Sequence, residues 1–426
     1  MTKPITAVLL GAGLRGAHAY GPYALAHPSE LKFVAVAEPD PVRRAQFAAA
    51  HHIPPERQFS TWEDVMEHAK LADVLLNCTQ DQMHYASSLA ALHAGYDMLL
   101  EKPMTNTLAE TVHLVQTAEK QGRLLQICHV LRYAPFFVAL HDVLKSGRLG
   151  QIVTVEHREN VLSWHMAHSF VRGNWRNATL SSPMILSKCC HDLDVLYWNL
   201  GRPVTRLHSF GSLVHYRPEN APEGATRRCT DGCPAAEACP WDARKLYLNM
   251  NNNGWPVTAI ASDLSEAGRR NALETGPYGR CVYDCDNDVV DNQTVNMVLP
   301  GGETAVLHMH GHSHLESRTM RYDGSRATLR GLFSALEQRI EIHDHVTGRR
   351  EDVPIPLSGS GHGGGDFGIM RSFVHAVNGD ETALTNARES LESHLMAFAA
   401  EESRLQHTVV DMSDFRQRAE RSTALL

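Results

Sequence analysis

Apolar and polar positions in the first part of the chain follow two alternating patterns. Short runs of consecutive apolar residues occupy positions 5–10, 33–37, 72–77, 98–100 and 124–128. Stretches with helical spacing separate these runs, at 41–50, 61–68, 84–94 and 108–121. Ser60 and Thr61, followed by Glu63 and Asp64, predict a capped helix start. Short strands that are apolar on both faces and alternate with helices are typical of a parallel sheet covered on both sides.

The pattern changes after about residue 132, where apolar and polar positions begin to alternate as in a half-buried strand. Val153, Val155 and His157 start this alternation. Further alternating runs lie at 294–299, 304–310 and 327–329. They predict a large, open and mostly antiparallel sheet.

Other segments of the second part have different compositions. Helical patterns occur at 136–144, 367–377 and 387–406. Residues 216–290 are rich in Pro, Gly, Asn and Cys and are typical of a long insertion, whereas 358–365 is glycine-rich and predicts a flexible loop. The sequence therefore predicts an α/β protein with a first domain at 1–131 and a second, α+β domain at 132–426.

Composition narrows the class of protein. The 426 residues are 43% hydrophobic and carry a formal net charge of −8. An acidic chain is a poor candidate for binding nucleic acid, because phosphate neutralisation needs clustered Lys and Arg. We find neither a secretory signal nor an apolar stretch of the ~20 residues that a membrane helix requires. We therefore expect a soluble, cytoplasmic protein whose nine cysteines are thiols or metal ligands.

A glycine motif follows the first predicted strand directly. Its glycines allow a tight turn and a close approach of the backbone to a pyrophosphate at a helix N-terminus. Glu38 ends the second strand, where a carboxylate can bind ribose hydroxyls and repel a 2′-phosphate. This favours NAD over NADP, although Arg43 and Arg44 leave NADP open, and it indicates a Rossmann domain. The expected cofactor contacts in the motif are Gly11, Gly13, Leu14, Arg15 and Gly16.

Three further motifs follow the glycine motif along the chain. Glu101-Lys102-Pro103 follows the fourth strand, Arg132-Tyr133-x-Pro135 follows the fifth, and His191-x-x-Asp194 comes later. With the glycine motif, they resemble the glucose–fructose oxidoreductase/inositol dehydrogenase family over nearly the whole chain. The resemblance implies a Rossmann domain, a second domain with a large open sheet, and a homodimer or homotetramer formed through that sheet.

The resemblance also implies roles for individual residues. Lys102 is expected between the nicotinamide and the substrate, where an ammonium can orient a hydroxyl and stabilise alkoxide character, and His191 is expected as acid/base. The family motif D-x-G-x-H-x-x-D is altered here, because Ser187 replaces the first Asp and Cys189 the Gly. The proton relay must therefore differ. Lys188 and Tyr133 are further catalytic candidates, and Asp192 and Asp194 are expected to bind substrate. Thr79, His84 and Glu101 are expected to contact the cofactor.

A histidine- and tryptophan-rich stretch precedes the His191 motif. Its spacing would place the aromatic and basic side chains on one face of a helix. Aromatic planes suit sugar rings, and Arg with His suits a carboxylate, phosphate or sulfonate, so we predict an anionic sugar. A structural face at a subunit contact is the alternative. The residues are Trp164, His165, His168, Arg172, Trp175 and Arg176.

Five cysteines lie in the predicted insertion. Four thiolates around one ion would stabilise a loop with little core of its own. We predict a structural Zn²⁺ bound by Cys229, Cys233, Cys239 and either Cys281 or Cys285, with an iron–sulfur cluster or unligated thiols as alternatives. The remaining cysteines are expected to pack as small apolar side chains; they are Cys78, Cys128, Cys189 and Cys190.

Histidines alternate along one strand-like run. Side chains at such spacing share one face of a sheet. We expect a polar sheet face at an interface or pocket edge, rather than a second metal site. The residues are His308, His310, His312 and His314.

Two reactions share the first step that these motifs indicate. In the interpretation we favour, oxidation of a sugar ring at C3 acidifies the C2 proton, the aglycone is eliminated, water adds and the hydride returns, as in the sulfoquinovosidase-like glycoside hydrolases. The titratable residues around His191 are numerous enough for that route. The alternative is a plain NAD-dependent dehydrogenase that releases a keto-sugar and NADH. A non-catalytic NAD-binding regulator is a third possibility, against which the intact Lys102 and His191 argue.

Overall fold

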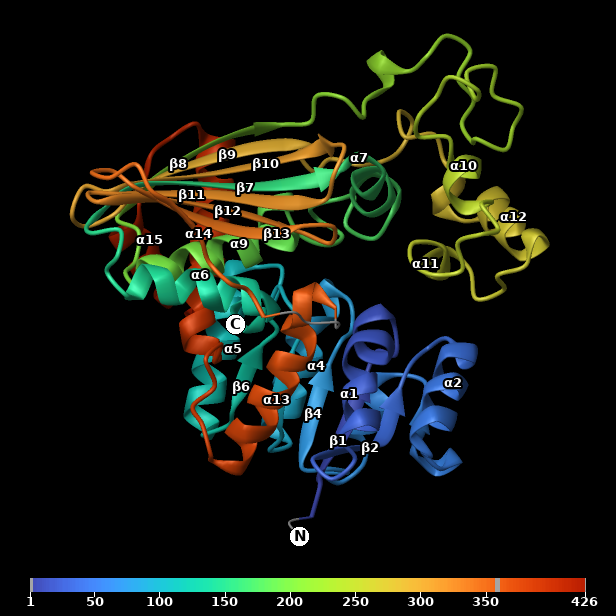
Figure 1. The fold of residues 1–426 in the computed structure, drawn as a ribbon. Helices are drawn as coiled ribbons and strands as arrows, with labels where there is room; N and C mark the ends of the chain where they lie inside the picture. Colours follow the sequence, from blue (N-terminus) through green and yellow to red (C-terminus); the bar gives the residue numbers. More distant parts are fainter. Residues whose placement is uncertain (1–2, 357–360, 426) are drawn as a thin grey trace.

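The computed structural model describes residues 3–356 and 361–425 and shows two layered domains (Figure 1). The first contains a six-stranded parallel sheet in the order β3-β2-β1-β4-β5-β6. The buried strands match the predicted apolar runs, and Gln58–Phe59 adds a short edge strand. The strands are β1 Ile5–Leu10, β2 Leu31–Ala37, β3 Gln58–Phe59, β4 Val74–Asn77, β5 Asp97–Leu100 and β6 Leu125–Ile127.

Helices cover both faces of this sheet, as predicted for a Rossmann domain. Thr61 and Asp64 form a reciprocal capping box at the start of α3, which confirms the predicted cap. A π-helical segment, Leu14–Tyr20, follows the glycine motif and continues as α1. The α-helices are α1 Gly21–Ala26, α2 Pro41–His51, α3 Trp62–Met66, α4 Asp81–His93 and α5 Leu108–Gln121.

The second domain is built on a nine-stranded sheet in the order β14-β13-β12-β11-β7-β10-β9-β8-β15. Its pairs are antiparallel except for β7 with β10, so the predicted, mostly antiparallel sheet is confirmed. The strands are β7 Ile152–Leu162, β8 Arg206–Ser212, β9 Asn292–Val298, β10 Thr304–Ser313, β11 Ser317–Gly324, β12 Ala327–Ser334, β13 Gln338–Asp344, β14 Arg350–Asp352 and β15 Val410–Asp411.

One face of this large sheet is covered and the other is open (Figure 1). Helices α6, α9 and α14 lie between the sheet and the first domain, and the short helix α8 leads into α9. No helix in the described part of the chain is long and apolar enough to cross a membrane. The bounds are α6 Pro135–Lys145, α8 Met184–Ser187, α9 Cys190–Leu200, α14 Ala387–Gln406 and α15 Met412–Ser422.

The chain leaves the sheet between β8 and β9 and forms the insertion. In Figure 1 this segment extends away from the edge of the sheet and places α11 and α12 above α2 of the first domain. Its separate core cluster contains only four buried residues, one of which is Cys229. The helices are α10 Ala243–Tyr247, α11 Val257–Ile260 and α12 Glu266–Thr275.

The C-terminal part of the chain returns to the first domain. Helix α13, Gly365–Asn378, packs its apolar side into the same core cluster as β1 and β2. Of the predicted loop at 358–365, residues 358–360 lie outside the described residues. Positions 362–364 form a short 3₁₀ turn, and α13 starts at Gly365, two residues before its predicted start.

Candidate active site

The glycine motif forms a turn whose backbone is open on one side. Gly11 has a φ of +85°, and a Cβ there would overlap the carbonyl of Cys78. A Cβ at Gly13 would meet no protein atom within 4 Å. This open space, at the N-terminus of the helical segment beginning at Leu14, fits the pyrophosphate of a dinucleotide. Glu38 is nearby: its carboxylate accepts from the amide of Ala12 at 2.8 Å.

Arg15 reaches from this turn to the end of β5. Its Nε donates to Glu101 at 2.6 Å, and its terminal nitrogen donates to Tyr20 at 2.6 Å and to Asp366 of α13 at 2.8 Å. Burial alone would raise the pKa of Glu101, but the Arg15 charge and the Tyr20 hydroxyl hold it below its ordinary value. Glu101 is therefore ionised, and the expected cofactor residue Arg15 is a link between three chain segments.

The loop after β5 holds Lys102 at the domain boundary. The Lys102–Pro103 peptide is cis, and Lys102 Nζ donates to the carbonyl oxygen of Ser187 at 2.7 Å. His84 braces the loop, because its ring nitrogens lie 2.7 Å from the Pro103 carbonyl and 3.1 Å from that of Thr79. With this buried ring fully engaged, His84 supports Thr79 and the lysine loop.

His191 lies at the start of α9. It is buried, and its Nδ1 has no hydrogen-bond partner among the described residues. Burial, and then the nearby charge of Lys102, lower the pKa of His191 well below its ordinary value. Its ring centroid lies 5.8 Å from that of His129 and 6.2 Å from that of His362. A neutral imidazole thus lies within the electrostatic influence of Lys102, and its Nδ1 is enclosed by protein.

Lys188 lies in a buried network of opposite charges. Its Nζ is 2.8 Å from Glu316 and 3.2 Å from Glu159. Arg318 pairs with Glu159 at 2.8 Å and with Asp192 at 2.8 Å. Burial raises the pKa of Glu159 to about 7 despite these cations, and neither carboxylate oxygen has a donor in hydrogen-bond geometry among the described residues.

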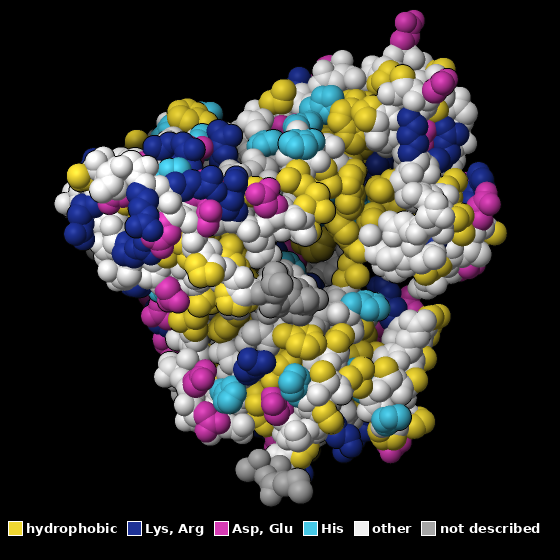
Figure 2. All heavy atoms as spheres, in the orientation of Figure 1, with side chains coloured by type: hydrophobic (Ala, Val, Ile, Leu, Met, Phe, Trp, Pro, Cys, Tyr) yellow, Lys and Arg dark blue, Asp and Glu magenta, His cyan; other side chains and the backbone are white. Residues whose placement is uncertain are grey.

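His165 connects this network to aromatic side chains of the insertion. Its Nδ1 lies 3.0 Å from Glu316, and its ring centroid lies 4.9 Å from that of Trp255, edge to face. Trp164 also lies 4.9 Å from Trp255. Figure 2 shows a hollow between the two domains, bordered by hydrophobic side chains. Trp255 is 39% exposed and can offer an aromatic surface to a ligand.

The expected single helical face at 165–176 is wrong. The short helix ending at His165 continues as a π-helix, Met166–Arg172, in which the hydrogen bonds span five residues, and the helix ends before Gly173. His168 is buried and bonds to the hydroxyl of Tyr247 at 2.7 Å.

The remaining basic and aromatic residues of that stretch are engaged within the protein. Arg172 is buried, and Arg176 forms an ion pair with Asp286 at 2.8 Å. Trp175 donates from its indole to Asp81 at the start of α4, at 3.1 and 3.2 Å. The two guanidinium groups therefore do not support the expected contact with an anionic substrate.

Two further expectations, that Asp192 and Asp194 bind substrate, need correction because these side chains face inward. Asp192 accepts from Arg318 and lies 2.7 Å from His157. Burial would raise the pKa of Asp192, but the charge of Arg318 outweighs burial and lowers the pKa to about 2. Asp194 receives two hydrogen bonds from Arg132, both 2.7 Å long, and does not pair with His191. Both carboxylates are at most 1% exposed, so they position cations rather than bind substrate.

Tyr133, expected as a catalytic residue, also contacts other parts of the protein. Its hydroxyl accepts from Gln126 at 3.0 Å and lies 3.1 Å from that of Thr385. Burial raises its pKa above the ordinary value. The side chain thus fastens the C-terminal segment to β6, and its hydroxyl bonds among the described residues go to Gln126, Thr385 and Ser372.

Four cysteines of the insertion lie close together, as expected, but their side chains are not arranged as a metal site. Cys229, Cys233, Cys239 and Cys281 line one cavity, and Cys285 does not. In the described part of the chain, no three His, Cys, Asp or Glu side chains are arranged to hold a metal ion. The predicted zinc is therefore not found as a preformed site. Cys128, Cys189 and Cys190 are buried, as expected, and Cys78 is partly buried.

The alternating histidines lie on β10 and just beyond it. His308 and His310 contact Thr294 and Asn160 of the neighbouring strands, both at 3.1 Å. His312 lies 3.5 Å from Asp291. These contacts fit the polar strand face that was expected.

Several residues of the site carry no sequence motif. Glu159 comes from β7, Glu316 from the turn before β11 and Arg318 from β11. His129 follows β6, and His362 lies in the 3₁₀ turn before α13. Their side chains meet only because strands far apart in sequence are adjacent in the sheet. Only His362 had a local sequence signal for a place in the site: it lies in a glycine-rich segment, and such a loop can bring a side chain close to a ligand.

Comparison with known proteins agrees with this architecture. The model of an oxidoreductase family with an NAD-binding Rossmann fold matches residues 5–129, and the C-terminal alpha/beta domain of that family matches 142–412. The putative oxidoreductase YteT of Bacillus subtilis is 24% identical over 76% of this chain and 77% of its own length.

Other relatives match over a smaller share of their length. Inositol 2-dehydrogenase 4 of Saccharopolyspora erythraea is 31% identical over 51% of this chain and 60% of its own. The structure of a levoglucosan dehydrogenase in complex with NADH and levoglucosan superposes with a TM-score of 0.71 at 15% identity, covering 96% of this chain and all of that one. At this identity the superposition shows the shared fold.

The two family models together cover most of the chain, and their boundary falls where the parallel sheet ends. The glycine turn and the lysine loop lie in the first matched region, and His191 lies in the second. The chain therefore belongs to the glucose–fructose oxidoreductase/inositol dehydrogenase family of oxidoreductases.

Proposed function

We propose that this protein oxidises a ring hydroxyl of a sugar or cyclic polyol with NAD. The observation that carries the proposal is the position of Lys102, whose ammonium is held by the Ser187 carbonyl at the domain boundary, near enough to the buried His191 for its charge to help keep that imidazole neutral. When bound, NAD supplies a hydride acceptor. The open backbone at Gly13 fits its pyrophosphate, and Glu38 is placed to accept from ribose hydroxyls.

Each residue has a role that follows from its surroundings. Lys102 is held by the Ser187 carbonyl and has further N–H donors to orient the carbinol oxygen. As the hydride leaves the carbon, the hydroxyl proton passes to the imidazole of His191, which is neutral before the reaction. Glu101 stays ionised through Arg15 and holds a negative charge beside the lysine.

The proposed substrate class rests on the family and on the aromatic border of the site. Relatives include an inositol dehydrogenase and a levoglucosan dehydrogenase, both named for ring polyols. Trp255 and Trp164 offer aromatic surface next to His165, which suits a sugar ring. Since Arg172 and Arg176 are engaged elsewhere, a charged substituent on the sugar has no support from them.

Redox-neutral glycoside hydrolysis is a second candidate that one observation favours. His165, Glu316 and Lys188 form a linked titratable set beside the Lys102–His191 pair. A dehydrogenase has no need for this second set, whereas the elimination of an aglycone and the addition of water require further proton transfers.

One experiment separates the candidates. Purified protein is incubated with NAD and one compound at a time. The compounds are glucose and glucuronate, which compare a neutral with an anionic sugar, then myo-inositol, levoglucosan and the 4-nitrophenyl glycosides of both anomers. Nicotinamide absorbance and nitrophenol release are followed together. Net NADH with a free sugar or polyol supports the dehydrogenase, and nitrophenol release that requires NAD without net NADH supports hydrolysis. Neither product with any compound, in a protein that binds NADH, would count against the proposed substrate class.

We also propose that the open face of the nine-stranded sheet joins subunits into a homo-oligomer. Phe210 on β8 is 60% exposed on a strand of this sheet, and large exposed apolar side chains at such a position favour an interface. Light scattering after size-exclusion chromatography would show a dimer or larger species. Phe210→Glu should shift it toward the monomer, and an unchanged mass would argue against this face.

A further inference from the structure

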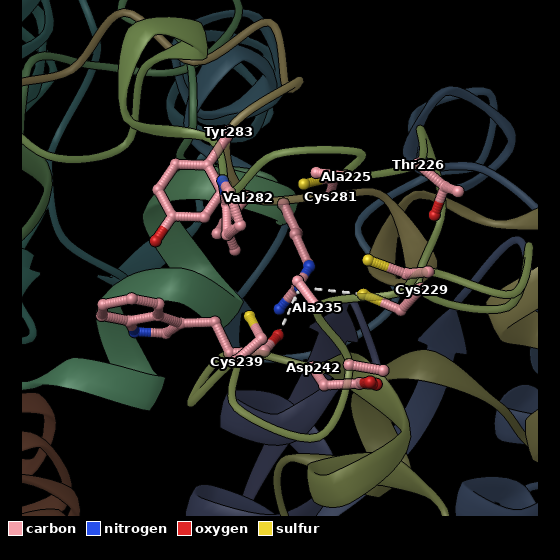
Figure 3. A pocket seen from close by; sticks show the side chains of 14 residues that line it. Ala225, Thr226, Cys229, Ala235, Cys239, Asp242, Cys281, Val282 and Tyr283 are labelled. Atoms are coloured by element: carbon pink, nitrogen blue, oxygen red, sulfur yellow. Dashed lines mark hydrogen bonds between the residues drawn. The ribbon is translucent and has the colours of Figure 1, made fainter.

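The cavity lined by cysteines lies inside the insertion and is separate from the site described above. Figure 3 shows Cys229, Cys239 and Cys281 around it, with Tyr283 and Asp242 at its border. It encloses about 20 Å³, enough for one water-sized sphere. Cys285 takes no part in the lining, because its Sγ is turned to the carbonyl oxygen of Cys281 at 3.2 Å.

A buried cation lies against this cavity without an anion to match it. The Arg172 guanidinium is 2% exposed and donates to the carbonyl oxygens of Arg280 and Trp241, at 2.7 Å each. Its terminal nitrogen also lies 3.7 Å from Cys229 Sγ. Across 3–356 and 361–425, no carboxylate lies within ion-pair distance of Arg172. Burying an unpaired charge is strongly unfavourable, so negative charge is expected here.

The neighbouring carboxylate does not supply that charge. Asp242 also lines the cavity, but it is paired with Arg244 at 2.6 Å. The thiols are the remaining groups that can become anionic at the cavity wall. A thiol that loses its proton to a metal ion becomes a permanent thiolate.

The insertion has only a small apolar core of its own, because its residues near β9, such as Val282, Tyr283 and Val289, pack into the main core of the molecule. Its own buried cluster consists of Cys229, Ala243, Tyr247 and Leu273, although the segment between β8 and β9 spans 213–291. Segments with so small a core are usually held by a disulfide or a metal. All five cysteines of the insertion are free thiols in this structure.

We propose that Cys229, Cys233, Cys239 and Cys281 bind one thiophilic divalent cation, with Zn²⁺ as the leading candidate, and that Arg172 donates an N–H bond to the Cys229 thiolate. Four thiolates around a divalent ion leave two negative charges, of which the guanidinium offsets one. Four thiol protons leave to solvent as the ion binds. Since the metal-free side chains are not arranged as a site, the thiols rotate toward the cavity when the ion enters.

This assignment gives the insertion a structural role next to the active site. Arg172 is the last residue of the π-helix that starts directly after His165. A metal that fixes Arg172 therefore fixes the segment that places His165 beside Glu316 and Trp255. The proposal does not depend on the substrate or on the reaction.

Metal content of the full-length protein is the direct test. Protein purified without chelator is analysed by plasma mass spectrometry, and the ion released by a mercurial is titrated with a zinc-sensitive dye. We expect about one zinc per chain. Cys281→Ser should lose the metal, whereas Cys285→Ser is the matched control and should retain it. Equal retention, or equal loss, in the two variants would overturn the assignment of the ligands.

A second measurement keeps the test valid if Cys281→Ser does not fold. Wild-type protein stripped with chelator is titrated with Co²⁺, whose thiolate charge-transfer and tetrahedral ligand-field bands report sulfur ligation. Bands that saturate at one equivalent, and that are displaced by Zn²⁺, support the site. No metal in the purified protein together with no cobalt spectrum would overturn the proposal, as would bound iron with acid-labile sulfide. Arg172→Gln should leave the cobalt bands in place but weaken the retention of zinc against chelator.

Discussion

Glu159 should make the stability of this protein depend on pH in a predictable direction. Its carboxyl is buried between Lys188 and Arg318, and burial raises its pKa from 4.5 to about 7. The native protein therefore holds this proton more tightly than the unfolded chain does. The resulting stability is fully present below pH ~4.5 and is lost as pH rises through ~7. The size of the shift corresponds to about 3 kcal/mol of unfolding free energy.

The variant Glu159→Gln isolates this contribution, because an amide remains neutral at every pH. Unfolding by urea is followed by tryptophan fluorescence for wild type and variant from about pH 5 to about pH 9. The free energy of the variant relative to wild type should increase by about 3 kcal/mol across that range. Glu156→Gln on the same strand is the control, since its carboxylate is exposed and pairs with Arg158.

The pH dependence of Glu159→Gln, compared with that of wild type and of Glu156→Gln, shows whether the reasoning holds. A difference between Glu159→Gln and wild type that stays constant over the pH range would show that Glu159 is ionised throughout. The reasoning would then be wrong, and Lys188 and Arg318 would outweigh the effect of burial. A pH dependence that appeared equally in Glu156→Gln would point to an effect of the whole strand and not of the buried carboxyl.

Three other variants test the site. Lys102→Met should lower kcat by roughly 10²–10⁴-fold with little change in the Kd for NADH, and a loss of NADH binding measured by fluorescence would contradict its role toward the substrate. Gly13→Ala should keep the wild-type Tm but weaken NADH binding, because its Cβ enters only open space; unchanged affinity would refute the placement of the pyrophosphate. Asp194→Asn should cost about 3–5 kcal/mol in urea unfolding, since it leaves the buried Arg132 guanidinium without its anion, and a loss near zero would contradict that.

The fold could be predicted from the sequence wherever a segment carries its own pattern. The apolar runs gave the strands of the first domain, and Thr61 with Asp64 marked a helix start because capping is a local interaction. The destination of α13 could not be predicted. Its amphipathic pattern shows a buried face, but nothing local says that Ile369 and Phe373 pack against strands more than 300 positions earlier.

The same distinction applies to the candidate site, where local motifs could be predicted and long-range contacts could not. The glycine turn and the lysine loop were recognisable because each is a short continuous motif after a strand. The stretch at 165–176 failed because the prediction assumed 3.6 residues per turn, whereas the chain forms a π-helix that Gly173 ends. Glu159 and Glu316 were missed because their convergence on Lys188 depends on the pairing of β7 with β11.

Both domains are needed for the electrostatics around Lys102. The lysine belongs to the first domain, but the carbonyl that holds its ammonium belongs to Ser187 of the second. Glu101, next to it, is kept ionised by Arg15, and Arg15 is in turn held by Asp366 of α13. A charge placed by three separate segments remains fixed only while all three are packed together. The position of Lys102 therefore depends on the C-terminal segment, although no residue of that segment appears in the motifs that identify the family.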